Sequence, residues 1–478
     1  MSANGYHYLD LESGKFARTD RNDLKAFFRA LEASHTRKLV VHFHGGLVSR
    51  EAAHESASRY SRAYTEAGAE SLFFVWNSDL GTILEQNLPA IASEAVFWTV
   101  VSRVRALVCW GATNIPVAVA GAREGALRRG PILPANESAQ NLRRQASQAD
   151  PVIVPREMNA ADHAQALEAL QNDGALRTRF LEIAPPWARA PGSRGVGAAR
   201  SKPTLMSPDV LEKAYPASQK NARSMVLSSF LFKRVIAAAG AVLKRYVTRT
   251  QHGLYATIVE EVLRAFYAAS VGCAIWGAMK DNAVEAFSGS ERSHAGSAFI
   301  TELLQWWDNS KEVTLVGHSA GSIFVVELIQ HLVLANSKLR ANCVLLAPAC
   351  SFERFAKGLT DFRKAVKALR IFDLSDELEL GYWEVPYLYN ASLLYLVSGI
   401  LEPTVDCPLI GMQRYFSGRK PYATTQMTSV RKFLEPALNW SPTTVAPTRL
   451  CHAKRHGGFD RDPDTLKSLA NIIKAGIQ

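Results

Sequence analysis

Short apolar runs alternate with amphipathic segments at the start of the chain. Residues 5–11, 38–46 and 70–76 have the length and apolar content of buried strands. Between these runs, residues 21–34 and 50–68 repeat apolar side chains at helical spacing. Strands that alternate with helices predict a mostly parallel central sheet flanked by helices, which is the α/β class.

A long insertion interrupts this alternation at residues 78–290. The insertion carries helical patterns, such as 87–111 and 252–279, joined by connectors rich in proline, glycine and arginine. The sequence therefore predicts a core made of residues 1–77 and 291–478, with a mainly helical cap inserted before its second half.

The alternation of strand and helix patterns returns after the insertion. Strands are predicted at 312–317, 342–347 and 368–374, with helices between them. Irregular structure is expected over 377–446, followed by a last strand that includes His452 and a last helix from Pro463.

Several features bear on the compartment of the protein. The longest uncharged run of the insertion, 106–122, has 17 residues, whereas a membrane-spanning helix needs about 20 apolar ones. The first residues form no apolar signal region, and the six cysteines show neither zinc-site nor disulfide spacing. The sequence predicts a cytoplasmic protein with no cofactor and no metal, and secretion without a signal peptide is the alternative.

One short motif carries the candidate chemistry. The sequence GHSAG follows a strand pattern and opens a helical one, so that Gly317, His318 and Gly321 would form a sharp elbow around Ser319. Such an elbow lifts the serine above a helix N-terminus, where the amide dipoles favour negative charge. Ser319 is therefore the candidate nucleophile, and an ordinary strand-to-helix turn is the alternative.

A strand followed by this elbow resembles the α/β-hydrolase superfamily. An earlier strand of the chain ends in His44, Gly45 and Gly46, where this family places its oxyanion-hole loop. The resemblance implies that the amide of Gly46 or Leu47 acts together with that of Ala320. It also implies that His44 shapes the loop and transfers no proton.

The resemblance further implies a carboxylate between the serine and the histidine in chain order. One position that the family uses is occupied by Ala347 and is therefore vacant. The other position lies beyond the next strand, where Asp376 falls in the loop and is favoured. Asp373, still within the strand pattern, and Glu377 are the alternatives, and Glu379 follows in the same segment.

The base is expected in the loop before the last helix. His456 precedes two glycines and a helix start marked by Asp462 as N-cap and Pro463 at the first helical position. His456 is favoured over His452, and a surface histidine beside basic neighbours is the alternative. In this interpretation His456 takes the proton of Ser319, Asp376 fixes its tautomer, and an acyl-enzyme forms.

Composition adds a hypothesis about the substrate. Twelve basic and two acidic residues give the segment 189–249 a net charge of +10, out of +11 for the chain. The insertion also carries aromatic residues such as Phe97, Trp98 and Trp110. Basic helices with apolar faces are typical of contact with anionic membrane surfaces. The sequence therefore predicts an esterase or lipase for lipid-like acyl esters, in peripheral contact with anionic membrane, and solvated lysines on a cap helix are the alternative.

Other functions fit parts of this pattern. A peptidase or a thioesterase would use the same three residues, because the triad serves amides and thioesters as well as esters. A non-catalytic relative that serves as a binding or scaffold protein is a further alternative. Nucleic-acid binding is not expected, since no recognition motif accompanies the basic charge.

Overall fold

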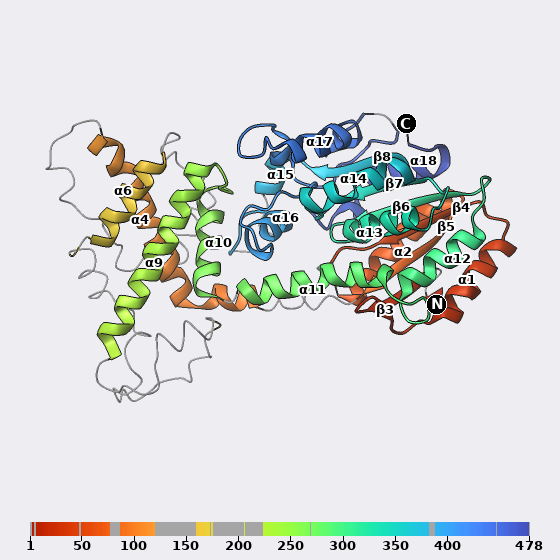
Figure 1. Ribbon diagram of the computed structural model, residues 1–478, viewed down its shortest axis with the longest axis horizontal. Coiled ribbons are helices and arrows are strands. Elements are labelled where there is room, and N and C mark those ends of the chain that lie inside the picture. The colour runs from red at the N-terminus through yellow and green to blue at the C-terminus, as the bar shows by residue number, and fades with distance from the viewer. Residues whose placement is uncertain are drawn as a thin grey trace.

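The computed structural model shows a sheet flanked by helices and a separate group of helices, linked by the long helix α11 (Ala269–Ser288) (Figure 1). The described residues are 2–3, 6–46, 49–76, 87–119, 159–172, 174, 205, 223–267, 269–381, 388–445 and 447–477. The predicted α/β class and mostly parallel sheet are confirmed.

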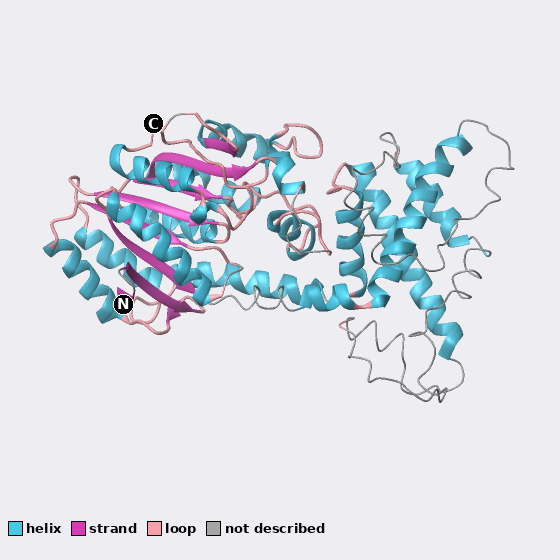
Figure 2. Cartoon of the chain, turned by 180° about the vertical axis from the view of Figure 1, so that it is seen from behind, coloured by secondary structure: helices cyan, strands magenta, loops and turns pink. Residues whose placement is uncertain are grey.

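Within the described residues, nine strands form one sheet, drawn in magenta in Figure 2. Their order is β1 (Ser2–Ala3), β2 (Tyr6–Glu12), β5 (Glu70–Trp76), β4 (Lys38–Phe43), β6 (Glu312–His318), β7 (Ala341–Leu346), β8 (Val366–Leu374) and β9 (Leu438–Ser441), with β3 (Lys15–Phe16) beside β2. All neighbours from β2 to β9 are parallel, and the short β1 and β3 are antiparallel to β2.

The central strands are buried on both faces of the sheet. Every residue from Leu39 to Phe43 is buried, which explains why β4 reads as a continuous apolar run without alternation. The flanking helices are α1 (Arg21–Ala33), α2 (Arg50–Glu66), α12 (Ala295–Trp306), α13 (Gly321–Leu334), α14 (Phe352–Ala365), α17 (Thr425–Leu434) and α18 (Pro463–Ala475). Helix α2 packs against α18, and α13 packs against α14.

The described part of the insertion is helical. It comprises α4 (Ala95–Val119), α6 (Ala160–Asn172), α9 (Arg223–Thr248), α10 (Leu254–Phe266) and α11. Helix α9 is central to this group, because α4, α6 and α10 all pack against it. Among the described helices, none is long and apolar enough to cross a membrane.

The last strand lies earlier in the chain than the sequence pattern indicates. Residues 377–446 contain α17 and β9, so the prediction of irregular structure is wrong there. His452 lies in no strand, and its neighbour Cys451 forms only an isolated bridge with Thr443. The four residues of β9 are too few for a recognisable pattern, and their register is set by pairing with β8. The helix start at Asp462 and Pro463 is confirmed, since the Asp462 carboxylate accepts a hydrogen bond from the Thr465 amide.

The backbones of β4 and α13 approach so closely that no side chain fits between them. A Cβ atom at Gly321 would lie 2.7 Å from the carbonyl oxygen of His44 and closer still to that of Phe43. A Cβ atom at Gly317 would lie 2.9 Å from the carbonyl oxygen of Gly321. These two glycines therefore permit the turn that joins β6 to α13.

We expect Gly321→Ala to lower the free energy of unfolding by about 2–3 kcal/mol, because the new methyl group displaces backbone that is fixed in the sheet. The matched change Gly277→Ala, in α11, meets open space within 4 Å and should raise the free energy of unfolding by about 0.5–1 kcal/mol. Urea unfolding of the two variants and the wild type measures both effects. Equal effects of the two substitutions would contradict this account of the elbow.

Candidate active site

Ser319 occupies a strained position between β6 and α13. Its φ of +52° lies in the left-handed region, which costs a non-glycine residue about 1–3 kcal/mol. The Ser319 amide donates to the Leu346 carbonyl at 2.8 Å, and the Ser319 carbonyl accepts from the Ser322 hydroxyl at 2.6 Å. Among the described residues the Ser319 hydroxyl makes no hydrogen bond, so it is available as a nucleophile.

The glycine loop after β4 lies directly against the elbow. A Cβ atom at Gly45 would lie 3.6 Å from the Cβ atom of Ser319, and one at Gly46 would lie 2.5 Å from that of Ala320. The backbone of the glycine loop and the backbone of the elbow therefore lie close to each other at Ser319. Leu47, the other predicted amide donor of this loop, lies outside the described residues.

The environment of His44 fixes the tautomer of its imidazole. The Trp76 amide donates to Nε2 at 3.0 Å, so Nδ1 carries the proton and donates to the Gly45 carbonyl at 2.5 Å. The ring also stacks on Trp76 with centroids 3.8 Å apart. Burial lowers the pKa of His44 to about 3, with the His318 ring adding to the effect and the two backbone hydrogen bonds opposing it. Both ring nitrogens are thus occupied by backbone, and His44 holds the glycine loop in place.

The structure brings His456 to the elbow. The Nε2 atom of His318, the residue before Ser319, donates to the His456 carbonyl at 3.0 Å, and the two rings lie 5.4 Å apart between centroids. Among the described residues, neither ring nitrogen of His456 has a hydrogen-bond partner, although the residue is buried. Burial, with a smaller effect of His318, holds the pKa of His456 well below its ordinary value. Burial therefore favours the neutral form of this ring.

Asp373 lies in the same transverse row of the sheet as the serine. The Ser319 amide bonds to β7 and the Ala347 amide bonds to the carbonyl of Phe372, so the row runs from Ser319 through Ala347 to Asp373. Asp373 is fully buried, and neither of its carboxylate oxygens has a hydrogen-bond partner in the part of the chain that the structure describes. Burial, aided by nearby Glu379, raises the pKa of Asp373 well above its ordinary value.

Asp376 begins the short helix α15 (Asp376–Leu380), just beyond β8. Its amide donates to the Gln413 side chain at 2.8 Å, and its Oδ1 atom accepts from the Tyr395 hydroxyl at 2.5 Å. Within the described residues, no hydrogen bond joins Asp376 to His456. Glu377 is exposed in the same helix, and Glu379 is buried and accepts from the Ser392 hydroxyl.

His452 is engaged elsewhere. Its Nδ1 atom lies 2.7 Å from the Asp464 carboxylate, and about two fifths of each side chain is exposed. The structure thus brings the glycine loop against Ser319 and joins the His456 backbone to the neighbouring His318, but among the described residues no hydrogen bond joins the His456 ring to the Ser319 hydroxyl. The candidate carboxylates lie at the same edge of the sheet, and within the described part of the chain none of them is hydrogen-bonded to that ring. His452 lies at the surface.

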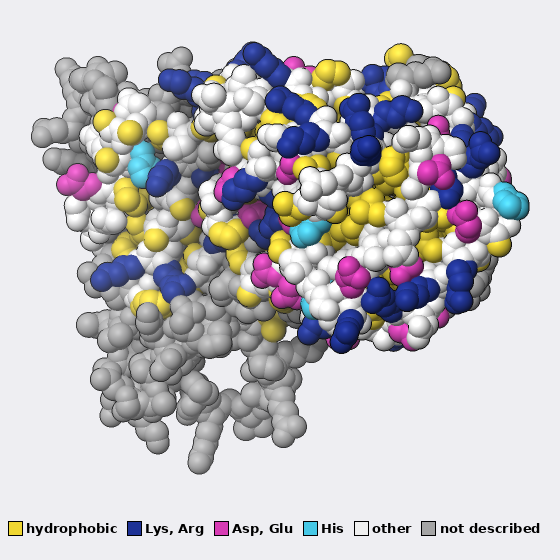
Figure 3. Space-filling model, turned by 45° about the vertical axis from the view of Figure 1, so that its right-hand side comes forward, with side chains coloured by type: hydrophobic (Ala, Val, Ile, Leu, Met, Phe, Trp, Pro, Cys, Tyr) yellow, Lys and Arg dark blue, Asp and Glu magenta, His cyan; other side chains and the backbone are white. Residues whose placement is uncertain are grey.

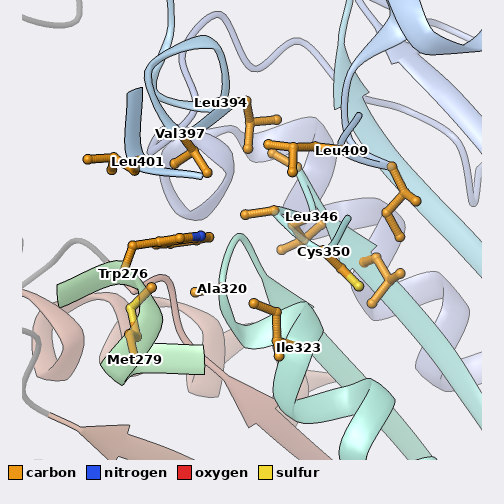
Figure 4. Packing of buried hydrophobic residues seen from close by; sticks show 14 of the residues in the cluster. Trp276, Met279, Ala320, Ile323, Leu346, Cys350, Leu394, Val397, Leu401 and Leu409 are labelled. Atoms are coloured by element: carbon orange, nitrogen blue, oxygen red, sulfur yellow. The ribbon is translucent and has the colours of Figure 1, made fainter. Parts of the chain in front are cut away.

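A set of apolar side chains above the elbow was not anticipated from the sequence. Trp276 and Met279 point from α11 toward Ala320 (Figure 4). The other labelled members are Ile323, Leu346, Cys350, Leu394, Val397, Leu401 and Leu409, and all are buried. We call this set the apolar cluster. The spacing of Trp276 and Met279 on one helical face is the only signal in the sequence that could have found it.

The aromatic residues that the sequence singled out lie elsewhere. Phe97 packs against Tyr267 within the insertion, and the Trp98 indole donates to the Ala92 carbonyl. The side chain of Trp110 lies outside the described residues. Of the insertion, α11 rather than α4 supplies the aromatic group near the elbow.

An ion pair fixes α11 above the site. The Trp276 indole donates to one oxygen of the Glu402 carboxylate at 2.6 Å, and the Lys280 ammonium contacts the other at 2.8 Å. Glu402 directly follows the π-helical turn Val397–Leu401, which carries part of the apolar cluster. The Glu402 carboxylate therefore connects the two elements that carry much of the apolar cluster, helix α11 and the turn Val397–Leu401.

A buried charge cluster ties the insertion to the sheet domain. We use this name for Arg245, His252, Glu260, Asp406 and Arg414. His252 lies between Glu260 and Asp406, with each ring nitrogen 2.9 Å from a carboxylate oxygen. Arg245 reaches the other oxygen of Glu260 at 2.5 Å. Burial alone would raise the pKa of Glu260, but His252 and Arg245 outweigh it and bring the value to about 2.

This cluster extends to the candidate acid. Tyr415 and Tyr422 donate to Asp406 at 2.7 and 2.6 Å, and the Arg414 guanidinium lies 5.6 Å from the centre of the Tyr395 ring. Tyr395 in turn donates to Asp376. A continuous set of buried contacts therefore runs from α9 and α10 of the insertion to the loop that follows β8.

Comparisons of this chain with protein-family models, with curated proteins and with solved structures find no match. Among the described residues, no group of three or more His, Cys, Asp or Glu side chains could hold a metal ion. On the face seen in Figure 3, Lys and Arg side chains lie interspersed with Asp and Glu. What the protein does must therefore be argued from the elbow and its surroundings.

Near pH 5 the wild-type His44 ring is protonated only in the unfolded chain, so unfolding takes up a proton at this residue. We expect His44→Gln to reduce the uptake on unfolding by about one proton per molecule. The pKa of His44 is about 3 in the folded protein and about 6.5 in the unfolded chain. The contribution of the neutral His44 ring to the free energy of unfolding is therefore fully present above about pH 6.5. It is lost as the pH falls toward 3, at about 1.4 kcal/mol per pH unit.

Urea unfolding at intervals between about pH 4.5 and about pH 7.5 gives the slope of the free energy of unfolding for the variant and the wild type. The variant should show the shallower slope below pH 6.5. Parallel curves would mean that the buried imidazole of His44 titrates normally, contrary to its burial and hydrogen bonds.

Proposed function

We propose that this protein is a serine hydrolase of the α/β-hydrolase superfamily, and that it cleaves carboxylic esters with long apolar acyl groups. One observation carries the proposal. A serine with left-handed backbone stands at a strand-to-helix turn against a glycine loop, and its hydroxyl has no hydrogen bond among the described residues. The residue before it, His318, contacts His456, whose buried imidazole likewise lacks a hydrogen bond within that part of the chain. Strained backbone and unpaired buried polar groups are costly, and they concentrate at catalytic sites.

The proposed chemistry assigns one role to each group. His456 takes the proton of Ser319 as the serine oxygen attacks the ester carbonyl. The amides of Ala320 and Gly46 stabilise the oxyanion, and each such donor is worth about 3–4 kcal/mol of barrier in serine hydrolases. His456 then protonates the leaving alcohol, and a water molecule activated by the same imidazole releases the acid and restores the serine.

Asp376 is the proposed partner of the imidazole. Its Oδ1 atom is held by Tyr395, which leaves Oδ2 as the acceptor for His456 once the ring turns toward the serine. In this role Asp376 fixes the tautomer of His456 and stabilises its protonated form.

The apolar cluster supports an apolar acyl group. Its members surround Ala320, the residue after the serine, and the charged neighbours Lys280 and Glu402 neutralise each other. A hydrocarbon chain can be buried in such surroundings, whereas the polar backbone of a peptide would be left without partners. This favours fatty acyl esters over peptides, and thioesters of the same acids are the second candidate substrate.

Peripheral contact with anionic membrane is also part of the proposal, and it is supported by the few basic side chains of the insertion that the structure describes as exposed. Most of the basic segment 189–249 lies outside the described residues. Of the rest, Arg245 is buried in the charge cluster and cannot face a membrane, whereas Lys233 and Lys244 are exposed. A cytoplasmic protein that binds peripherally to membrane is the corresponding expectation.

We expect a fluorophosphonate probe to label the wild-type protein and to leave Ser319→Ala unlabelled, because the probe reacts only with an activated serine. Ser429→Ala, on the exposed face of α17, is the control and should label fully. A panel of p-nitrophenyl esters of increasing chain length should show kcat/KM rising from short to long acyl groups. Labelling that persists in Ser319→Ala would point to a different protein class, and hydrolysis of short esters alone would remove the lipid-like substrate.

The acid can be identified by paired substitutions. We expect Asp376→Asn to lower kcat by about 10³–10⁴-fold, as loss of the triad carboxylate does in other serine hydrolases. Asp373→Asn keeps the shape of a buried group that has no hydrogen-bond partner, and should change kcat by less than about tenfold. Fluorophosphonate labelling rates give a second measure of serine activation in both variants. The reverse pattern would assign the role to Asp373.

A further inference from the structure

A groove of about 650 Å³ runs between α6 and α9, away from the elbow. Its apolar surface comes from Leu167 on α6 and from Phe232, Ile236, Ala237 and Ala241 on α9. The volume is within the range of small-molecule sites, about 300–1,000 Å³. No residue of the groove belongs to the candidate active site.

Close packing of the two helices creates the groove. A Cβ atom at Gly240 would lie 2.9 Å from a methyl group of Leu167, so glycine is what permits this approach. The His163 Nε2 atom donates to the Gly240 carbonyl at 2.9 Å and fixes the two helices to each other. The small side chains of Ala237 and Ala241 leave the space above the contact open.

The charged side chains that line the groove, Lys233 and Lys244, are both positive. Lys233 and Lys244 line it eleven positions apart on α9, about 16 Å along the helix axis. Both side chains are exposed, and neither has an ion pair among the described residues. The other polar residues of the described lining are Gln171 and His163, so none of the lining residues that the structure describes brings a carboxylate to the two ammonium groups.

We propose that this groove binds one long-chain fatty acid, independently of the proposed hydrolysis. The hydrocarbon chain lies along the apolar surface between the two lysines, and the carboxylate pairs with an ammonium group at one end. A lysine is a point charge on a flexible apolar stem, which suits a small anion at the mouth of an apolar channel. A neutral lipid would bury its chain equally well but would give neither lysine ammonium group an anionic partner.

Displacement of cis-parinaric acid, a fluorescent fatty acid, from the full-length chain tests the proposal. All measurements use the Ser319→Ala background, so that no ester competitor is consumed. Palmitate should compete at least about tenfold more strongly than its methyl ester, because only the acid carries the charge that the lysines attract. Octanoate, with a short chain, should compete weakly.

Two variants distinguish binding in this groove from binding elsewhere. Ala237→Leu fills the groove from an exposed helical position and should weaken palmitate binding about tenfold or more. The double variant Lys233→Gln/Lys244→Gln should weaken palmitate binding about five- to tenfold and leave the methyl ester unchanged. Lys364→Gln, at an exposed position of α14, is the control and should bind as the parent does.

Three outcomes would overturn the proposal. In the first, palmitate and its methyl ester compete equally. In the second, Ala237→Leu and the double lysine variant, both folded by circular dichroism, bind palmitate like the parent. In the third, only vesicles of anionic phospholipid bind and the free acid does not, which would make the lysines part of a membrane-contact surface. Fluorophosphonate labelling of the wild type tests only the proposed nucleophile, and the displacement assay tests only the groove. Either proposal can therefore fail while the other holds.

Discussion

The site depends on the contact between the backbone at the end of β4 and the backbone at the start of α13. Because no Cβ atom fits between Gly321 and the carbonyls of Phe43 and His44, the chain must turn within two residues after β6. That turn leaves Ser319 in the left-handed region and sets the Ala320 amide at a helix N-terminus, beside Gly46. The strain at the serine is held by the hydrogen bonds of a sheet that is buried on both faces, which a surface loop could not do.

The insertion is placed by electrostatics as much as by apolar packing. Burying ions is costly unless their charges balance and their hydrogen bonds are complete. In the buried charge cluster, two arginines and His252 face the carboxylates of Asp406, Glu260 and its neighbour Glu261. Each ring nitrogen of His252 lies 2.9 Å from one of two carboxylates. This arrangement fixes α10, and α11 follows it directly to carry Trp276 and Met279 over the elbow.

The sequence was sufficient where local pattern and tertiary structure agree. β4 and β6 are apolar runs because both faces of each are covered, and the same holds for the second half of β8. The elbow and the Asp462 cap are signalled by residues adjacent in the chain. It failed where long-range contacts decide. Strand β9 has only four residues, and its identity comes from its pairing with β8. Likewise, the members of the buried charge cluster are up to 169 positions apart, from Arg245 to Arg414, so no spacing rule could have joined them.

Two of the residues with unpaired buried polar atoms, His456 and Asp373, lie near the elbow, although other such atoms occur throughout the described residues. An uncompensated buried polar atom costs about 1–3 kcal/mol, so folded proteins rarely keep one without a function. His456 and Asp373 each keep two such atoms: His456 is hydrogen-bonded through its backbone to His318, and Asp373 lies in the row of the sheet that runs from Ser319 through Ala347. The buried charge cluster shows that the same chain can satisfy carboxylates and an imidazole completely when their task is to hold structure. The unsatisfied imidazole of His456, next to His318 in the elbow, supports the proposed role of this residue in proton transfer.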